Sequence, residues 1–417
     1  MEAAKLIGVL ARIVRDVGVA EDLAQDALVS ALEQWPRQGI PRNPGAWLMT
    51  AAKHRAIDRL RRAKLLDRKH QELGQTMQAR ELEMPDFDTA PDSDPSDNLL
   101  RLMFTACHPV LTPDARVALT LRMLGGLTTD EIARAFLTAE PTIAQRIVRA
   151  KRTLAENQIP FEIPEREELA DRLSSVLSVL YLIFNEGYSA SSGDHWMRPA
   201  LCEEAMRLGR MLAEQVPREP EVHGLIALME IQASRFHART GPSGEPILLL
   251  DQNRVRWDGL LIQRGLAALK RGEALGATRG PYLLQATIAA CHARARTADA
   301  TDWTRIAHLY TELAATTPSP VVELGRAVAF SMAFGPEAGL NLVDALAANP
   351  DLRGYHRLPS VRGDLLFKLG RFGEAQPEFE RAAALATNAQ ERQMLLDRMQ
   401  ACRLRPINNS DELSKDR

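Results

Sequence analysis

Apolar residues recur with a helical period along most of this chain. Near the N-terminus, Leu6, Leu10 and Ile13 are three or four residues apart, which places them on one face of a helix. The same spacing runs through residues 20–35, where one face carries Leu23, Ala27, Leu28, Ala31 and Leu32. It resumes near Gly45 after a loop with three prolines. Aromatic residues make up only 5% of the sequence while alanine and leucine abound, a composition that favours helix over strand. We therefore predict an all-α protein.

Breaks in the helical pattern divide the chain into five parts. The segment after residue 70 carries three prolines among aspartates and glutamates, which is typical of a flexible linker. Two further prolines, Pro160 and Pro164, precede a long apolar helical region. The predicted parts are a helical domain over 1–70, an acidic flexible linker over 71–97, a second helical domain over 98–158, a helical extension over 165–407 and a disordered tail over 408–417.

The formal net charge of −2 conceals a strong separation of charge along the chain. From Ala52 to Lys69, eight lysines and arginines stand against two acidic residues, a local net charge of +6. From Gln71 to Asn98, eight acidic residues stand against one arginine, a local net charge of −7. The local charge therefore points to a polyanion such as nucleic acid as a partner of the first segment.

Residues 126–154 are typical of a helix-turn-helix. Thr128 followed by Glu131 fits a capping box, and Pro141 suits the first turn of a second helix. That helix has an apolar face made of Ile143, Ile147, Ala150 and Leu154. Its other face carries Gln145, Arg146, Arg149 and Arg152. Because arginine binds guanine edges and phosphates, we interpret this helix as one that lies in a major groove, rather than as a solvated helix of an ordinary hairpin.

The basic helix from Trp47 to Lys69 is a weaker signal when it is taken alone, because arginine-rich helix faces are often simply solvated. Here Trp47 and His54 lie beside the basic run, a combination that suits stacking of single-stranded bases and contacts to phosphates. Two basic modules on either side of an acidic tether predict a protein that binds two separated points on a duplex.

These motifs resemble those of a known family. Ala20–Leu28 and the stretch from Ala46 through Arg62 resemble region 2 of bacterial RNA polymerase sigma factors of the extracytoplasmic-function (ECF) class. Leu127–Leu154 is similar to region 4 of the same proteins. Together the two resemblances cover about the first 160 residues, and their order along the chain is highly specific.

The resemblance implies a role for individual residues. Asp22, Gln25 and Asp26 match the face that binds a coiled coil of the largest polymerase subunit. The residues matching the segment that binds the unwound minus-ten element are Lys53, His54 and Arg55, with Arg59, Arg61 and Arg62 on its backbone. The residues matching the helix that binds the minus-thirty-five element are Glu140, Thr142, Gln145, Arg146 and Arg149. The implied partners are core RNA polymerase and promoter DNA.

The extension contains a degenerate repeat. A set of residues resembling one tetratricopeptide unit comprises Leu366, Leu369, Gly370, Phe372, Ala375, Phe379 and Ala382. Three stretches, Tyr181–Tyr188, Asp251–Asp258 and Gly280–Gln285, look like the subgroup of ECF factors with a tetratricopeptide-like C-terminal domain. The extension is therefore expected to be a repeat-like helical array with a regulatory or interaction role.

Polar and aromatic residues gather at two places in this otherwise apolar extension. They are Asn185, Glu186, Tyr188, Asp251, Arg254, Arg256, Trp257 and Asp258. One interpretation is a groove that binds a peptide or small effector. The interpretation that we favour is a buried network in which arginines and aspartates pair with one another and fix the helices.

Other classes of function lack support in the sequence. The four cysteines form no CxxC pair and the histidines lack metal-ligand spacing, so we expect no metal, no cofactor and no disulfide framework. There is no nucleophile–base pattern, and we expect no enzyme. No uncharged apolar run is long enough to span a bilayer, so we expect a cytoplasmic protein. The alternative to a sigma factor is a ligand-sensing helix-turn-helix regulator that acts without polymerase.

Overall fold

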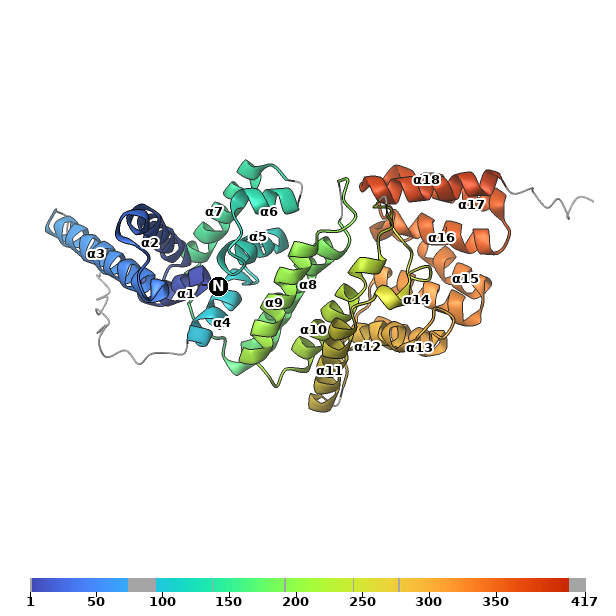
Figure 1. The fold of residues 1–417 in the computed structure, drawn as a ribbon, viewed down its shortest axis with the longest axis horizontal. Coiled ribbons are helices and arrows are strands. Elements are labelled where there is room, and N and C mark those ends of the chain that lie inside the picture. The colour runs from blue at the N-terminus through green and yellow to red at the C-terminus, as the bar shows by residue number, and fades with distance from the viewer. Residues whose placement is uncertain are drawn as a thin grey trace, which may run out of the picture. The chain divides into compact units, whose positions relative to one another are not determined.

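The computed structural model describes residues 2–73, 95–136, 138–190, 193–242, 244–276 and 278–404. These residues form eighteen α-helices and three short 3-10 helices, and they contain isolated β-bridges in place of strands (Figure 1). The prediction of an all-α fold is confirmed. The chain divides into two compact units, Met1–Ile183 and Phe184–Arg417, with the division inside helix α8 (Arg166–Tyr188).

The first three helices of unit 1 pack together (blue in Figure 1). They are α1 (Glu2–Val14), α2 (Val17–Gln38) and α3 (Pro44–Leu73). The carboxylate of Asp16 caps α2 by accepting a hydrogen bond of 2.9 Å from the Val19 backbone N–H, which fixes where the helix begins. Leu10 and Ala27 are fully buried between the helices, as their helical spacing predicts.

The next helices of unit 1 are α4 (Pro95–Ala106), α5 (Pro113–Met123), α6 (Thr129–Ala135) and α7 (Glu140–Glu156). Helix α4 packs on α1, and the first part of α8 packs back on α4 and α5. There the Ser175 hydroxyl donates to the carbonyl of Cys107 at 2.5 Å, and Arg116 donates to the same hydroxyl at 3.0 Å. Unit 1 therefore includes residues beyond 165, where we expect the extension to begin.

Helical structure overlaps both ends of the segment 71–97 that we predict to be a linker. Helix α3 continues to Leu73, and α4 begins at Pro95. Residues 74–94 lie outside the described residues, and so does the predicted tail over 408–417.

Unit 2 is a succession of helices in which neighbours along the chain pack against one another. They are α9 (Pro199–Gln215), α10 (Pro220–Ala233), α11 (Gly259–Leu275), α12 (Pro281–Arg294), α13 (Trp303–Thr316), α14 (Pro320–Phe334), α15 (Pro336–Leu346), α16 (Arg357–Lys368), α17 (Phe372–Leu385) and α18 (Ala389–Arg403). Three 3-10 helices complete it: η1 (Phe236–Ala238), η2 (Arg254–Arg256) and η3 (Pro350–Leu352). Proline opens many of these helices, because a first-turn residue needs no N–H donor and the proline ring presets a helical φ.

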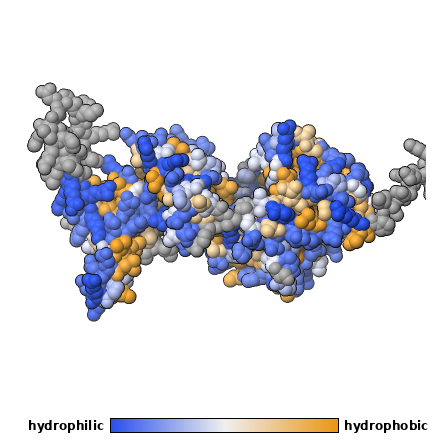
Figure 2. Space-filling model, turned by 90° about the horizontal axis from the view of Figure 1, so that it is seen from above, coloured by the Kyte–Doolittle hydropathy of each residue, from blue (hydrophilic) through white to orange (hydrophobic). Residues whose placement is uncertain are grey.

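Small residues allow the helices of unit 2 to approach closely. A Cβ added at Gly224 would lie 2.7 Å from the backbone nitrogen of Leu283, so α10 touches α12 through bare backbone. In the predicted repeat, Ala375 and Ala382 are fully buried around Phe379, where α16 packs on α17. Figure 2 shows that hydrophilic side chains cover most of the visible face of the described residues, with apolar side chains in smaller groups.

Candidate polymerase and nucleic-acid interface

Helices α6 and α7 form the predicted helix-turn-helix. The capping box is present: the Thr128 N–H donates to the Glu131 carboxylate at 2.7 Å, and the Glu131 N–H donates to the Thr128 hydroxyl at 3.2 Å. Helix α7 begins at Glu140 with Pro141 in its first turn. The buried residues of α7 are Ile143, Ile147, Ala150 and Leu154, as predicted. The apolar face therefore fixes which side of α7 is turned to solvent.

The solvent-facing side of α7 carries most of the predicted DNA-binding residues. Those that are exposed are Glu140, Thr142, Gln145, Arg149 and Arg152. Arg146 is half-buried and forms an ion pair of 3.3 Å with Asp114 on α5, so it also braces the two helices. Arg152 pairs at 2.6 Å with Glu156, one turn further along.

Val148 is a member of this face that sequence reasoning missed. Its exposed fraction is 63%, and it lies one turn from both Gln145 and Arg152. The helical spacing of three to four residues between exposed positions was the signal that could have found it. An exposed valine between polar residues suits contact with a thymine methyl group in a major groove.

Helix α3 presents a basic side. His54, Arg59, Arg61 and Arg62 are exposed, whereas Lys53 is half-buried. The side chains from residue 63 to the end of α3 lie outside the described residues.

Two predicted DNA-binding residues of α3 are engaged within the protein. Arg55 donates to the hydroxyl of Ser30 on α2, which turns its guanidinium toward the bundle. Trp47 is half-buried and meets Trp35 edge to face, with ring centroids 5.7 Å apart. Both residues therefore help to fix α3 on α2.

Helix α2 carries an exposed face that is acidic at one end and apolar at the other. Asp22, Gln25 and Asp26 are exposed, as their predicted role in binding polymerase requires. The helical spacing continues this face to Val29, which is 52% exposed, and Leu32, which is 74% exposed. From its spacing, Leu32 would lie on the inner side of the helix, and that interpretation is wrong. Exposed leucine and valine beside carboxylates favour a protein partner for this face.

Beside this face, the side chain of Glu21 is buried, with only 3% exposed. One carboxylate oxygen accepts hydrogen bonds from Arg122 on α5 at 2.7 Å and from Gln25 at 2.6 Å. The other oxygen lies 2.6 Å from the ammonium of Lys151 on α7. Lys151 also lies 3.6 Å from Asp22. The helix-turn-helix is thereby tied to α2 through a buried carboxylate.

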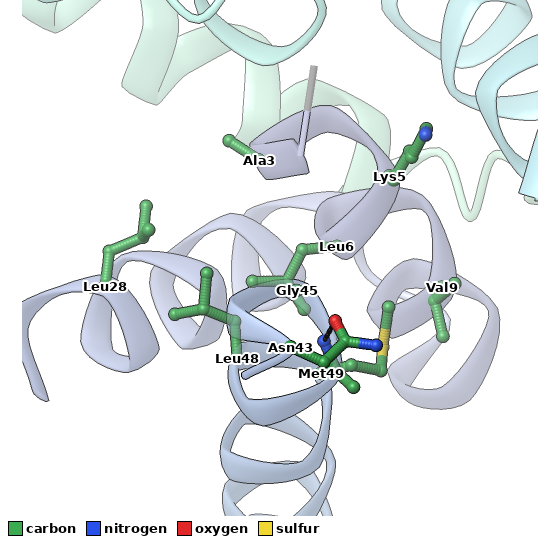
Figure 3. Close-up of a pocket in the computed structure, with 10 residues that line it drawn as sticks. Ala3, Lys5, Leu6, Val9, Leu28, Asn43, Gly45, Leu48 and Met49 are labelled. Carbon is green, nitrogen blue, oxygen red and sulfur yellow. Dashed lines mark hydrogen bonds between the residues drawn. The ribbon is translucent and has the colours of Figure 1, made fainter. Parts of the chain in front are cut away.

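A cavity of about 270 Å³ opens between α1, α2 and the start of α3. Figure 3 shows its lining, in which Leu6, Leu28 and Leu48 come from the three different helices. Asn43, at its rim, accepts a hydrogen bond of 3.1 Å from the Ala46 N–H. The lining is mainly apolar and offers no nucleophile–base pair.

In the polar cluster of unit 2, Glu186 forms a half-buried ion pair with Arg198, but the arginine–aspartate pairing that we favour from the sequence is not made by Arg254 and Asp258. The Asp258 carboxylate caps α11 by accepting from the N–H groups of Leu260 and Leu261. Arg254 donates to the carbonyl of Ala295 at 2.8 Å and to the hydroxyl of Thr301 at 3.1 Å. Among the described residues neither Arg254 nor Asp258 forms an ion pair. Backbone groups at the start of α11 and at the end of α12 are instead the partners of Asp258 and Arg254.

Aromatic rings take the place of carboxylates beside these cations. The guanidinium of Arg254 lies 4.9 Å from the ring centre of Trp257, and that of Arg235 lies 5.8 Å from the same ring. The guanidinium of Arg239 lies 3.6 Å from the ring centre of Tyr188. Burial lowers the pKa of Arg239 to about 10. The cluster thus concentrates positive charge in unit 2.

Comparison with known proteins identifies three segments of the chain. Family models match three segments: "Sigma-70 region 2" over residues 2–65, "Sigma-70, region 4" over residues 101–154, and "Family of unknown function (DUF6596)" over residues 172–273. No solved structure matches this chain significantly. Among the described residues, no helix combines the length and apolar character needed to cross a bilayer.

Among curated relatives, the "Uncharacterized protein R00370" of Rhizobium meliloti (strain 1021) is 43% identical over 92% of this chain and 90% of its own length. The "ECF RNA polymerase sigma factor SigK" of Mycobacterium ulcerans (strain Agy99) is 29% identical over 36% of this chain and 78% of its own length. SigK of Mycobacterium tuberculosis (strain ATCC 25618 / H37Rv) matches to the same extent. The chain therefore belongs to the family of the Rhizobium protein, and its two sigma-70 regions make it an RNA polymerase sigma factor of the ECF type.

Proposed function

We propose that the exposed face of α2 binds core polymerase, that α3 holds the melted strand of a promoter, and that α7 binds duplex DNA upstream. The observation that carries this proposal is that three helices of one unit expose three different chemistries. Helix α2 offers carboxylates beside apolar side chains, α3 offers arginines, and α7 offers a polar recognition face on a capped helix-turn-helix.

On α7, Arg149 and Gln145 supply the hydrogen bonds to base edges, and Arg152 supplies a phosphate contact. Arginine donates to guanine bidentately, and glutamine pairs bidentately with adenine by donating to N7 and accepting from the N6 amino group. Val148, between them on the helix surface, contributes contact with a thymine methyl group. Arg146 contributes less to the bases, because Asp114 already holds its guanidinium.

On α3, His54 lies closest to the unwound bases, and Arg59, Arg61 and Arg62 hold the phosphates. These side chains are exposed, so they are free to meet a strand that the duplex releases. Arg55 and Trp47 act on the strand through the position that they give to α3 rather than by direct contact, since both pack on α2.

The helical unit 2 is proposed as a regulatory or interaction module with a tetratricopeptide-like arrangement. Its cation-rich cluster of Arg235, Arg239 and Arg254 has no ion pair among the described residues, which favours an effector or peptide with acidic groups. The same proposal places the protein in the cytoplasm, with the polymerase.

Footprinting of the reconstituted complex tests the proposed roles of α3 and α7. With core polymerase, the chain is expected to protect an upstream duplex segment from nuclease and to make downstream thymines reactive to permanganate. A helix-turn-helix regulator acting without polymerase would protect duplex by itself and melt nothing. Protection in the absence of polymerase, with no melting when polymerase is added, would establish that alternative.

A further inference from the structure

The contact between Lys151 and Glu21 lies directly beside the face that we assign to polymerase. Glu21 lies at the edge of that face, and its carboxylate is enclosed by Arg122, Gln25 and Lys151. Both carboxylate oxygens are used, one by Arg122 and Gln25 and the other by Lys151. The Glu21 side chain is only 3% exposed, so the contact differs from a loose surface ion pair.

The side chain of Lys151 packs against α2 instead of pointing to the side of α7 that we assign to DNA. A Cβ added at Gly18 would lie 3.4 Å from the Cδ of Lys151, so the aliphatic stem of the lysine runs over the bare backbone at the start of α2. Only 20% of the lysine side chain is exposed, and its ammonium group also lies 3.6 Å from Asp22. Lys151 is thus the basic residue of α7 that faces away from the predicted DNA-binding side.

We propose that Lys151, Glu21 and Arg122 form a latch that holds the free factor in a closed state, in which Lys151 of its own helix-turn-helix lies at the acidic end of the polymerase-binding face of α2 and competes with polymerase for Asp22. The inference rests on the proposed function of that face. Core polymerase then binds more tightly once α7 has moved off α2. A closed state lowers the apparent affinity for polymerase by the fraction of molecules that are open.

The physical reason for a two-state latch lies in the burial of Glu21. A buried carboxylate is strongly destabilised when its cationic partner leaves and nothing replaces it. Opening must therefore be coupled either to hydration of Glu21 or to a new basic partner. A polymerase surface with a basic residue opposite Glu21 would supply that partner, so that binding and opening favour each other.

The latch is tested with Lys151→Met, which removes the charge and keeps the aliphatic stem. Lys151→Arg retains the charge, and Lys270→Met is a matched control because Lys270 is an exposed lysine on α11. Fluorophores on cysteines introduced at the exposed positions Gln38 and Glu156 report the separation of α2 and α7, since the native cysteines are buried. Affinity for core polymerase is measured on the same full-length proteins.

For Lys151→Met we expect lower energy transfer in the free chain and roughly tenfold tighter binding to core polymerase, because more molecules are open. Lys151→Arg and Lys270→Met are expected to match the parent protein. Unchanged energy transfer and unchanged affinity in Lys151→Met would overturn the latch. If no variant binds polymerase, the proposed function fails, while energy transfer still decides whether α7 is latched to α2. Should Lys151→Met fail to fold, Glu21→Gln removes the opposite charge for the same measurements.

Discussion

The ammonium of Lys151 on α7 lies 2.6 Å from a carboxylate oxygen of Glu21 on α2, two residues that are 130 positions apart in the chain. Their pairing means that the segment matched by the region 4 model and the segment matched by the region 2 model share one contact surface within unit 1. It also explains why α7 has basic residues on two sides. In our proposal one side binds DNA, and the other side packs against α2.

Replacing Arg149 by alanine is expected to weaken binding of upstream promoter duplex. Loss of a bidentate contact to a guanine costs about 1–3 kcal/mol, or roughly five- to 150-fold in affinity. Fluorescence anisotropy with the upstream duplex measures this loss at fixed salt. Arg264→Ala, at an exposed arginine on α11 of unit 2, is the matched control. Equal affinities of the two variants would show that Arg149 does not contact DNA.

Introducing a charge at Leu32 is expected to impair polymerase binding. In our proposal the exposed leucine is covered by the partner, and a carboxylate there would be desolvated without a cation. Leu32→Asp should therefore bind core polymerase at least about tenfold more weakly, since hot-spot truncations cost 2 kcal/mol or more. The control is Val321→Asp, because Val321 is 51% exposed on α14. If both variants bind core polymerase as tightly as the parent chain, the exposed face of α2 does not bind polymerase.

The stability of unit 2 should depend on pH through His292. Burial, and then the charges of Arg235 and Arg254, lower the pKa of His292 to about 4 from an ordinary value of 6.5. The unfolded chain then binds more protons than the folded one, so stability is full above pH 6.5 and is lost as the pH falls toward 4. The loss is at most roughly 3 kcal/mol.

Urea unfolding at pH 7 and pH 4.5 measures this loss for unit 2. His108 in unit 1 also has its pKa lowered to about 4, so the parent chain is compared with His292→Gln. The variant should lose less stability on acidification than the parent. Equal losses of stability in both proteins would show that His292 does not cause the pH dependence.

A methyl group at Gly224 is expected to force α10 away from α12. The added Cβ would lie 2.7 Å from the Leu283 nitrogen and 3.1 Å from its Cα, and neither backbone atom can rotate aside. Gly224→Ala should destabilise the protein by about 1–3 kcal/mol. Gly373→Ala on α17 has nothing within 4 Å, so it should be neutral or stabilising by up to about 1 kcal/mol. Thermal unfolding distinguishes the two, and equal melting temperatures would contradict the close approach.

Local features could be predicted from the sequence because their causes are local. The capping box of Thr128 and Glu131 depends on residues three positions apart, and the buried side of α7 follows from its helical period. Leu32 shows where this reasoning ends. An apolar residue at helical spacing marks a face that needs covering, and the period does not say whether the protein's own core or a partner covers it.

Long-range pairs could not be predicted in the same way. Arg55 fits a basic DNA-binding run by its neighbours in the sequence, yet its guanidinium meets Ser30 on another helix. Arg254 has aspartates close by in the sequence, but backbone carbonyls at the end of α12 are its partners. The hydrogen-bond partners of these arginines depend on which helix ends and hydroxyl groups the fold brings close to them. Neither the composition nor the local sequence predicts those partners.

The most direct test of the account is transcription from genomic fragments by core polymerase with and without the full-length chain. We predict that the chain associates with core polymerase and produces defined start sites that are absent without it. Sites should lie downstream of one shared pair of sequence elements, one melted and one double-stranded. Failure to associate with core polymerase, or start sites identical with and without the chain, would contradict it.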